Sequence, residues 1–88
     1  SLSSVLKAII VQKLIRGKNG AIKPAYEICI VTKPISQAIN SGKFHQIKNL
    51  MINSEGSISF EDSIKKLIEM GHINFEDAEK YVDDKSLL

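Results

Sequence analysis

The chain has 88 residues, of which 43% are hydrophobic and 25% are charged, and its single cysteine is Cys29. These values are typical of one small globular domain and exclude a disordered or fibrous chain. The longest apolar run, Ala8–Val11, is too short to span a membrane, and one cysteine cannot form an internal disulfide. We see no charged leader followed by an apolar stretch, so we expect no secretion signal and a cytosolic location.

The net charge of +2 conceals an uneven distribution. Residues 1–50 hold eight basic side chains and one acid, whereas residues 51–88 hold four basic and nine acidic side chains. A basic half is a feature of many nucleic-acid-binding proteins, but here the basic residues are spread singly and no aromatic platform accompanies them. We therefore expect no nucleic-acid partner, and we expect the two halves to attract each other or neighbouring subunits.

The first third of the chain predicts an antiparallel β-hairpin. Residues 1–7 are typical of the end of a helix, and β-branched, apolar residues then predict strands over 8–15 and 21–31. The intervening turn, 16–20, contains Asn19-Gly20, two residues that accept a positive φ angle. The first strand is apolar on both faces, which is typical of a strand covered on both sides.

Two features of the second strand have structural consequences. Pro24 cannot donate a hydrogen bond to a β-ladder, so we expect it at a sheet edge or a bulge. The alternation of side chains places two sets of three residues on opposite faces, namely Tyr26, Ile28 and Ile30 on one and Glu27, Cys29 and Val31 on the other.

After Thr32 the apolar period changes to that of a helix. Thr32 is a candidate N-cap, Pro34 is tolerated in a first turn, and Gly42 is a candidate helix end. The helix over 34–41 is amphipathic. Its inward face would consist of Ile35, Ala38 and Ile39, and its solvent face of Ser36, Gln37, Asn40 and Ser41.

Three further helices are expected over 44–53, 60–70 and 75–82, with a loop at 54–57. The last two begin with the same pattern, because Ser59 and Asn74 each stand three residues before an aspartate, as in a capping box. Gly71 has the position of a left-handed C-terminal cap. Two such copies are too few for a repeat protein.

The chain shows no catalytic or metal-binding motif. Neither Gly17-Lys18 nor Gly42-Lys43 stands in the spacing of a phosphate-binding loop, so we expect no ATP hydrolysis and no tight nucleotide binding by this chain alone. Cys29, His45 and His72 lack the spacing of zinc ligands. Cys29 is expected to be a buried structural thiol rather than a nucleophile. His45 is either a capping or packing residue or one with an intersubunit or nucleotide-side role.

Five segments in this order resemble the C-terminal end of the type IV pilus retraction, or twitching-motility, ATPases (the PilT family). They are Val5–Leu14, Ala25–Ile28, Gly42–Ile47, Asp62–Ile64 and Gly71–Ala78. The resemblance extends from about Leu2 to Val82. The most specific part is Gly-Lys-x-His-Gln-Ile, which follows a strand that contains Tyr-Glu-Ile.

The resemblance implies a fold and a role. Members of this family are hexameric cytoplasmic motors of the secretion ATPase superfamily, and their RecA-like domain carries the ATP- and magnesium-binding motifs, all of which would lie upstream of Ser1. Residues 1–33 would then be terminal strands of the RecA-like sheet, and residues 34–88 a C-terminal helical subdomain. The partners implied are the other subunits of a homohexamer and the pilus machinery of the inner membrane. The residues implied near a nucleotide or subunit interface are Gly42, Lys43, His45 and Gln46.

One helix departs from the family pattern. The family reads approximately Ala-Ile-Arg-Asn-Leu-Ile-Arg-Glu where this chain has residues 34–41, and the helix is thought to serve retraction. Both arginines are replaced here, by Ser36 and Asn40, and the glutamate by Ser41. The uncharged stripe of Ser36, Gln37, Asn40 and Ser41 is therefore a candidate partner-contact surface.

We thus expect an α+β fragment of an α/β RecA-like ATPase, with an antiparallel β-hairpin followed by three to four short helices and no catalytic residue of its own. Alternatives are a related pilus-assembly or secretion ATPase, and a self-standing α+β protein-interaction domain. We also expect this chain, in isolation, to self-associate through its apolar first strand.

Overall fold

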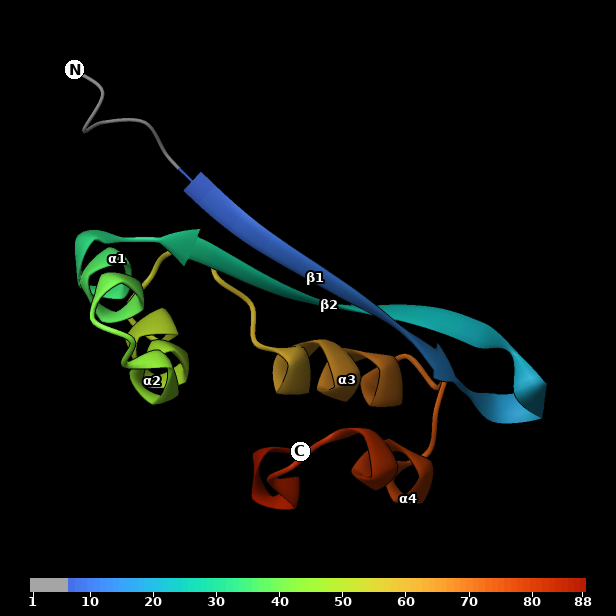
Figure 1. Cartoon of the computed structure of the whole chain (residues 1–88). Coiled ribbons are helices and arrows are strands. Elements are labelled where there is room, and N and C mark those ends of the chain that lie inside the picture. The colour runs from blue at the N-terminus through green and yellow to red at the C-terminus, as the bar shows by residue number, and fades with distance from the viewer. Residues whose placement is uncertain (1–6) are drawn as a thin grey trace.

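The computed structural model describes residues 7–88 and places every helix on one side of a two-stranded antiparallel sheet (Figure 1). The strands are β1 (Lys7–Arg16) and β2 (Ile22–Val31), and the α-helices are α1 (Lys33–Asn40), α2 (Ile47–Met51), α3 (Phe60–Glu69) and α4 (Phe75–Ala78). Short 3₁₀ turns occupy Lys18–Gly20, Phe44–Gln46, Glu79–Tyr81 and Lys85–Leu87. The antiparallel β-hairpin followed by short helices that the sequence predicts is confirmed. The helix end expected over 1–7 lies outside the described residues, apart from Lys7, which begins β1.

The hairpin turn has the geometry that its sequence predicts. Asn19 and Gly20 both adopt positive φ angles, 59° and 74°, and the amide of Gly17 donates to the carbonyl of Ala21 at 2.7 Å. These contacts set a register in which Arg16 faces Ile22 and Lys7 faces Val31. The turn also packs on the connection between α3 and α4, because the amide of Lys18 donates to the carbonyl of His72 at 2.9 Å.

The outer edge of β2 is bonded to the segment that leads into α3. Ile28 and Ile58 exchange two backbone hydrogen bonds, of 2.8 and 2.7 Å, and the amides of Tyr26 and Ile30 donate to the hydroxyls of Ser63 and Ser57. Alternate amides of a strand point to the same edge, so the nitrogen of Pro24 also lies on this edge. The absence of its N–H therefore costs no ladder bond, and the predicted edge position of Pro24 is confirmed.

Two separate apolar clusters hold the helices on the sheet. The larger cluster joins Ile15 and Ala25 of the hairpin to α3 and α4, and its other buried members are Phe60, Ile64, Leu67, Ile73 and Ala78. The smaller cluster lies at the opposite end of the hairpin, where Cys29 packs with Ile35 of α1 and Met51 of α2 (Figure 1). Cys29 is thus on the covered face, as the alternation of β2 predicts.

The helix boundaries follow the caps with one exception. Ser59 and Asn74 accept hydrogen bonds from the amides of Asp62 and Asp77, at 3.1 and 2.8 Å, as predicted. Thr32 occupies the N-cap position of α1, as predicted, but its side chain makes no capping bond. Pro34 has no N–H to donate, and the amide of Ile35, the donor equivalent to those of Asp62 and Asp77, is not bonded to Thr32.

Two helices are shorter than predicted, because each gives way to a 3₁₀ turn. The segment 44–53 begins with a 3₁₀ turn and becomes α-helical only over α2, and the segment 75–82 is α-helical only over α4. Gly42 and Gly71 end their helices with φ angles of 70° and 77°, as expected. Within the described residues, no helix is both long enough and apolar enough to cross a membrane.

The face of the hairpin opposite the helices is apolar and uncovered. Ile10 and Leu14 are 64% and 66% exposed, and Ile22 is half exposed. Within residues 7–88, β2 is the only strand that pairs with β1. The sequence predicts a strand covered on both sides, whereas the described residues bury only Ile15 of β1 and leave Ile9 and Val11, on the side of the helices, 49% and 44% exposed. An exposed apolar edge of this kind favours pairing with another chain.

Gly17→Ala tests how tightly the turn packs. A Cβ atom at residue 17 would lie 2.2 Å from the carbonyl oxygen of His72, although the φ of −98° is suitable for alanine. We expect a loss of roughly 1–3 kcal/mol in unfolding free energy. The control is Gly42→Ala, where a Cβ meets nothing within 4 Å and the cost is only that of the left-handed backbone, roughly 1 kcal/mol. Urea denaturation followed by far-ultraviolet circular dichroism measures both, and equal losses would contradict the packing described.

The uncovered face predicts that the 88-residue chain self-associates. Sedimentation velocity should show an average mass that rises with concentration. The double variant Ile10→Lys/Leu14→Lys should restore a monomer, because it places two charges on the apolar face. Met70→Lys changes an exposed apolar residue at the end of α3 and should leave the association unchanged. A wild-type chain that stays monomeric at high concentration would refute this expectation.

Candidate functional site

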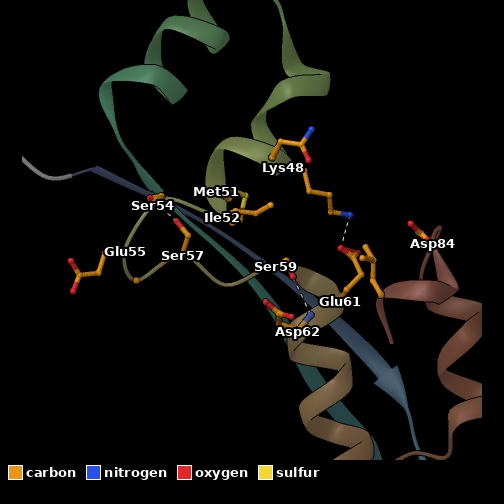
Figure 2. Close-up of a pocket in the computed structure, with 13 residues that line it drawn as sticks. Lys48, Met51, Ile52, Ser54, Glu55, Ser57, Ser59, Glu61, Asp62 and Asp84 are labelled. Atoms are coloured by element: carbon orange, nitrogen blue, oxygen red, sulfur yellow. Dashed lines mark hydrogen bonds and ion pairs between the residues drawn. The ribbon is translucent and has the colours of Figure 1, made fainter.

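A groove lies where two pairs of helices meet, namely α1 with α2 and α3 with α4. We call it the junction groove. It encloses about 690 Å³ between α2, the connection from Ile52 to Ser59, the start of α3 and the C-terminal 3₁₀ turn (Figure 2). Its charged side chains are Lys48, Glu55, Glu61, Asp62 and Asp84. Residues 48–62 and the C-terminal residues Asp84 and Leu87 therefore contribute to one surface.

One wall of the junction groove is made of serines that are already hydrogen-bonded. Ser54, which is buried, donates to the carbonyl of Ile30 at 2.5 Å, and Ser57 donates to the hydroxyl of Ser54 at 2.9 Å while it accepts from the amide of Ile30. This network attaches the connection between α2 and α3 to the end of β2. Because neither hydroxyl contacts a base, the serines have a structural role rather than that of nucleophiles.

An ion pair crosses the groove. Nζ of Lys48 on α2 lies 2.5 Å from Oε1 of Glu61 in the first turn of α3 (Figure 2). Glu61 is only 4% exposed, and its Oε1 has no other hydrogen-bond partner among residues 7–88. A carboxylate buried in this way depends on its cation, because an unpaired buried charge is costly. The pair is thus a direct link between the two helical pairs.

The charges around Lys48 are mostly negative. Hydrogen bonding and charge attraction to Glu61 raise the pKa of Lys48 above its ordinary value of 10.5, and the charges of Glu27 and Asp83 act in the same direction against the opposing effect of partial burial. Asp84, on the other side of the groove, accepts hydrogen bonds from the hydroxyl and amide of Ser86, which lower the pKa of its carboxyl group. Both groups are therefore ionised near neutral pH.

The buried cysteine has the surroundings of a structural thiol. Cys29 packs in the smaller apolar cluster, and burial, followed by the negative charge of Glu27, raises its pKa. A raised pKa keeps the thiol protonated, whereas a nucleophilic cysteine requires a lowered one. Across the part of the chain that the structure describes, no three acidic, histidine or cysteine side chains are grouped to hold a metal ion.

The four residues considered for a nucleotide or subunit interface lie together in the connection between α1 and α2. Gly42, Lys43, His45 and Gln46 are all exposed. The amides of Gly42, Lys43 and Gln46 donate to backbone carbonyls of this same region, at 2.8 to 3.1 Å. These amides are thus not free to cradle a phosphate as a glycine-rich loop does. None of the four residues lines the junction groove.

The uncharged stripe of α1 is a second exposed surface. Gln37, Asn40 and Ser41 are exposed, and Ser36 is half-buried. The apolar face of the same helix is turned inward, where Ile35 and Ala38 are buried and Ile39 packs against the smaller cluster. Because Ser41 is followed directly by Gly42, the stripe and the connection between α1 and α2 form one continuous surface.

Sequence reasoning missed the junction groove and its ion pair. Lys48 and Glu61 are 13 residues apart on different helices, so no helical spacing connects them. The only local signal for a buried ion pair is that Glu61 stands beside the buried Phe60. That signal is weak, because an acid in the first turn of a helix is already expected from its favourable interaction with the helix N-terminus.

Lys48→Met tests the dependence of Glu61 on its cation. We expect a loss of roughly 1–3 kcal/mol in unfolding free energy at pH 7, because a buried carboxylate loses its partner. Lys48→Arg should retain most of the stability. Lys80→Met is the control, since it removes an exposed pair with Asp77 and should cost within about 0.5 kcal/mol. Equal losses for Lys48→Met and Lys80→Met in urea denaturation would contradict the role of the pair.

The pH dependence of the same pair has a definite sign. The pKa of Lys48 is higher in the folded chain than its ordinary value of 10.5. Its contribution to stability is therefore fully present below about pH 10.5, and it is lost as the pH rises through the pKa of the folded state. The stability difference between the wild type and Lys48→Met should therefore be constant from pH 7 to 9 and shrink at strongly alkaline pH. A difference that already falls between pH 7 and 9 would exclude Lys48 as its source.

Comparisons with known proteins were made on sequence and on fold. No protein-family model matches the sequence. Over 85 residues the chain is 33% identical to the type IV pilus ATPase PilU of Pseudomonas aeruginosa, a match that covers 93% of this chain and 22% of PilU. Its fold matches the crystal structure of the pilus retraction motor PilT with bound ADP, with a TM-score of 0.71 and 31% identity, over 99% of this chain and 24% of that chain.

The chain thus spans about a quarter of the length of each of these two relatives. The sequence match and the fold match cover nearly all of the chain and point to the same kind of protein. The resemblance seen in the sequence is confirmed at this level: the chain is homologous to PilU and shares its fold with part of PilT, and both of these are type IV pilus ATPases.

Proposed function

We propose that this chain is the C-terminal part of a type IV pilus ATPase of the secretion ATPase superfamily. In that protein it would complete the sheet of a RecA-like domain and supply surface for contacts with other subunits and with the pilus machinery. The observation that carries the proposal is the uncovered apolar face of the hairpin, together with relatives about four times as long.

The exposed face supports the proposal on energetic grounds. Soluble proteins rarely leave a contiguous patch of large apolar side chains open, and such a patch usually marks a contact surface. In this hairpin Ile10, Leu14 and Ile22 are half or more exposed on the outer face, and β1 offers unpaired backbone groups at its edge. A further strand and a covering layer from a longer protein would satisfy both.

The proposal assigns nucleotide chemistry to residues outside this chain. ATP and magnesium would be held by motifs elsewhere in the ATPase, and the exposed connection from Gly42 to Gln46 would lie near the nucleotide or at a subunit boundary. The amides of Gly42, Lys43 and Gln46 are already bonded to backbone carbonyls. This supports a place beside the nucleotide rather than a direct role in holding its phosphates. In the longer protein we expect a homohexamer in the cytoplasm, peripheral to the inner membrane.

The complete gene product tests this assignment. We expect its sequence to contain a phosphate-binding loop before Ser1, and we expect the product to release phosphate from ATP in the presence of magnesium. The 88-residue chain alone should show no hydrolysis and no micromolar ATP affinity by calorimetry. A complete product without such a loop, or tight ATP binding by the 88 residues alone, would favour a self-standing interaction domain instead.

The stripe of α1 is proposed as a partner contact of the motor. Because Ser36 is half-buried, the test uses the exposed Gln37 and Asn40. The double variant Gln37→Glu/Asn40→Glu should change the unfolding free energy by within about 0.5 kcal/mol and leave ATPase activity unchanged. Twitching motility should fall, because unpaired carboxylates would have to be desolvated at the contact.

The control is Asn53→Glu, an exposed polar-to-acid change outside α1, which should leave motility intact. Normal motility in the α1 variant would remove the stripe as a contact. Loss of ATPase activity would show that α1 supports the motor core.

A further inference from the structure

We propose that the junction groove binds a basic, apolar segment of a partner protein, in which a lysine or arginine stands close to an aliphatic side chain. The inference rests on the shape, charge and apolar content of the groove. It holds whether or not the chain is part of an ATPase, so the two proposals can fail separately.

The first step is the charge of the groove. Four carboxylates line it against one ammonium group, that of Lys48. Lys48 is engaged with Glu61, and among residues 7–88 the other three carboxylates, of Glu55, Asp62 and Asp84, form no ion pair. The groove therefore has an excess of negative charge and offers free carboxylates to a cationic partner.

The second step is the apolar content. Ile52, at the end of α2, lines the groove and is 80% exposed (Figure 2). Leu87 contributes a second exposed apolar side chain from the opposite wall. Aliphatic side chains of a bound segment placed beside Ile52 and Leu87 would remove apolar surface from water, which is a main source of affinity in small interfaces.

The third step is the reason to expect a polypeptide rather than a small polar ligand. Small-molecule sites fix their ligands by a few convergent polar groups. Here Ser54 and Ser57 are already bonded to the end of β2, and Ser59 accepts from the amide of Asp62. The groups left to a ligand are exposed carboxylates spaced around an apolar side chain, which suits alternating basic and aliphatic residues.

The test uses the 88-residue chain and a 12-residue peptide of alternating lysine and leucine, with a peptide of alternating glutamate and leucine as the counter-probe. Binding is followed by ¹H–¹⁵N correlation spectra at a chain concentration below that of self-association. We expect shifts at Lys48–Ile52, Ser54–Asp62 and Asp84–Leu87, an affinity that falls with added salt, and no such shifts with the glutamate peptide.

Variants separate the two contributions. Asp62→Asn/Asp84→Asn should weaken binding roughly three- to fivefold per charge. Ile52→Ala should weaken it roughly tenfold. The matched control Glu69→Gln/Glu76→Gln removes the same charge from exposed residues outside the groove and should leave affinity within twofold.

Three results would overturn the proposal: no binding of the lysine peptide, equal binding of the glutamate peptide, or shifts confined to the uncovered hairpin face. Shifts in the groove that appear on concentrating the chain without peptide would assign the groove to a second copy, and would overturn the proposal equally.

Discussion

The arrangement of helices depends on the hydrogen bonds along the outer edge of β2. Ile28 pairs with Ile58, while Ser57 and Ser63 bind the amides on either side. These bonds fix the direction in which the chain leaves α2 and enters α3, so both helical pairs lie on the same face of the hairpin. Pro24 fits this edge because its missing N–H falls beyond the last of these bonds. The opposite edge, on β1, has no comparable segment among residues 7–88, and the face of the sheet that points away from the helices is also apolar and open.

Features that depend on neighbouring residues in the sequence could be predicted, whereas features that depend on contacts between distant residues could not. The turn at Asn19-Gly20 and the caps at Ser59 and Asn74 each depend on residues within four positions of one another, and the hairpin pairs two strands that this short turn joins. Thr32 stands at the N-cap position of α1 as the sequence predicts, but its hydroxyl makes no capping bond, a detail that the sequence pattern does not reveal. The pair of Lys48 and Glu61 brings together two helices that no periodicity connects, and the junction groove is defined by such contacts.

The relation to the pilus ATPases gives a physical reason for the open face. A strand that is apolar on both sides, like β1, is expected inside a sheet covered by two layers, and the described residues provide one layer. The matches cover nearly all of this chain but about a quarter of PilU and PilT. In the longer protein proposed above, Ile10 and Leu14 would face the interior and lose their exposure. The groove and the stripe of α1 lie away from that face.

The separation of the two apolar clusters has a consequence for how the chain opens. They share no buried residue, and the smaller one has only Cys29, Ile35 and Met51 at its centre. Native proteins open in cooperative units whose stabilities follow such packing boundaries. The amides of α1 and α2 would then exchange with solvent deuterium ahead of those of α3, while the large cluster around Ile64 stays closed. The two ends of the hairpin would behave as units of unequal stability, with the thinly packed end able to rearrange at lower energetic cost.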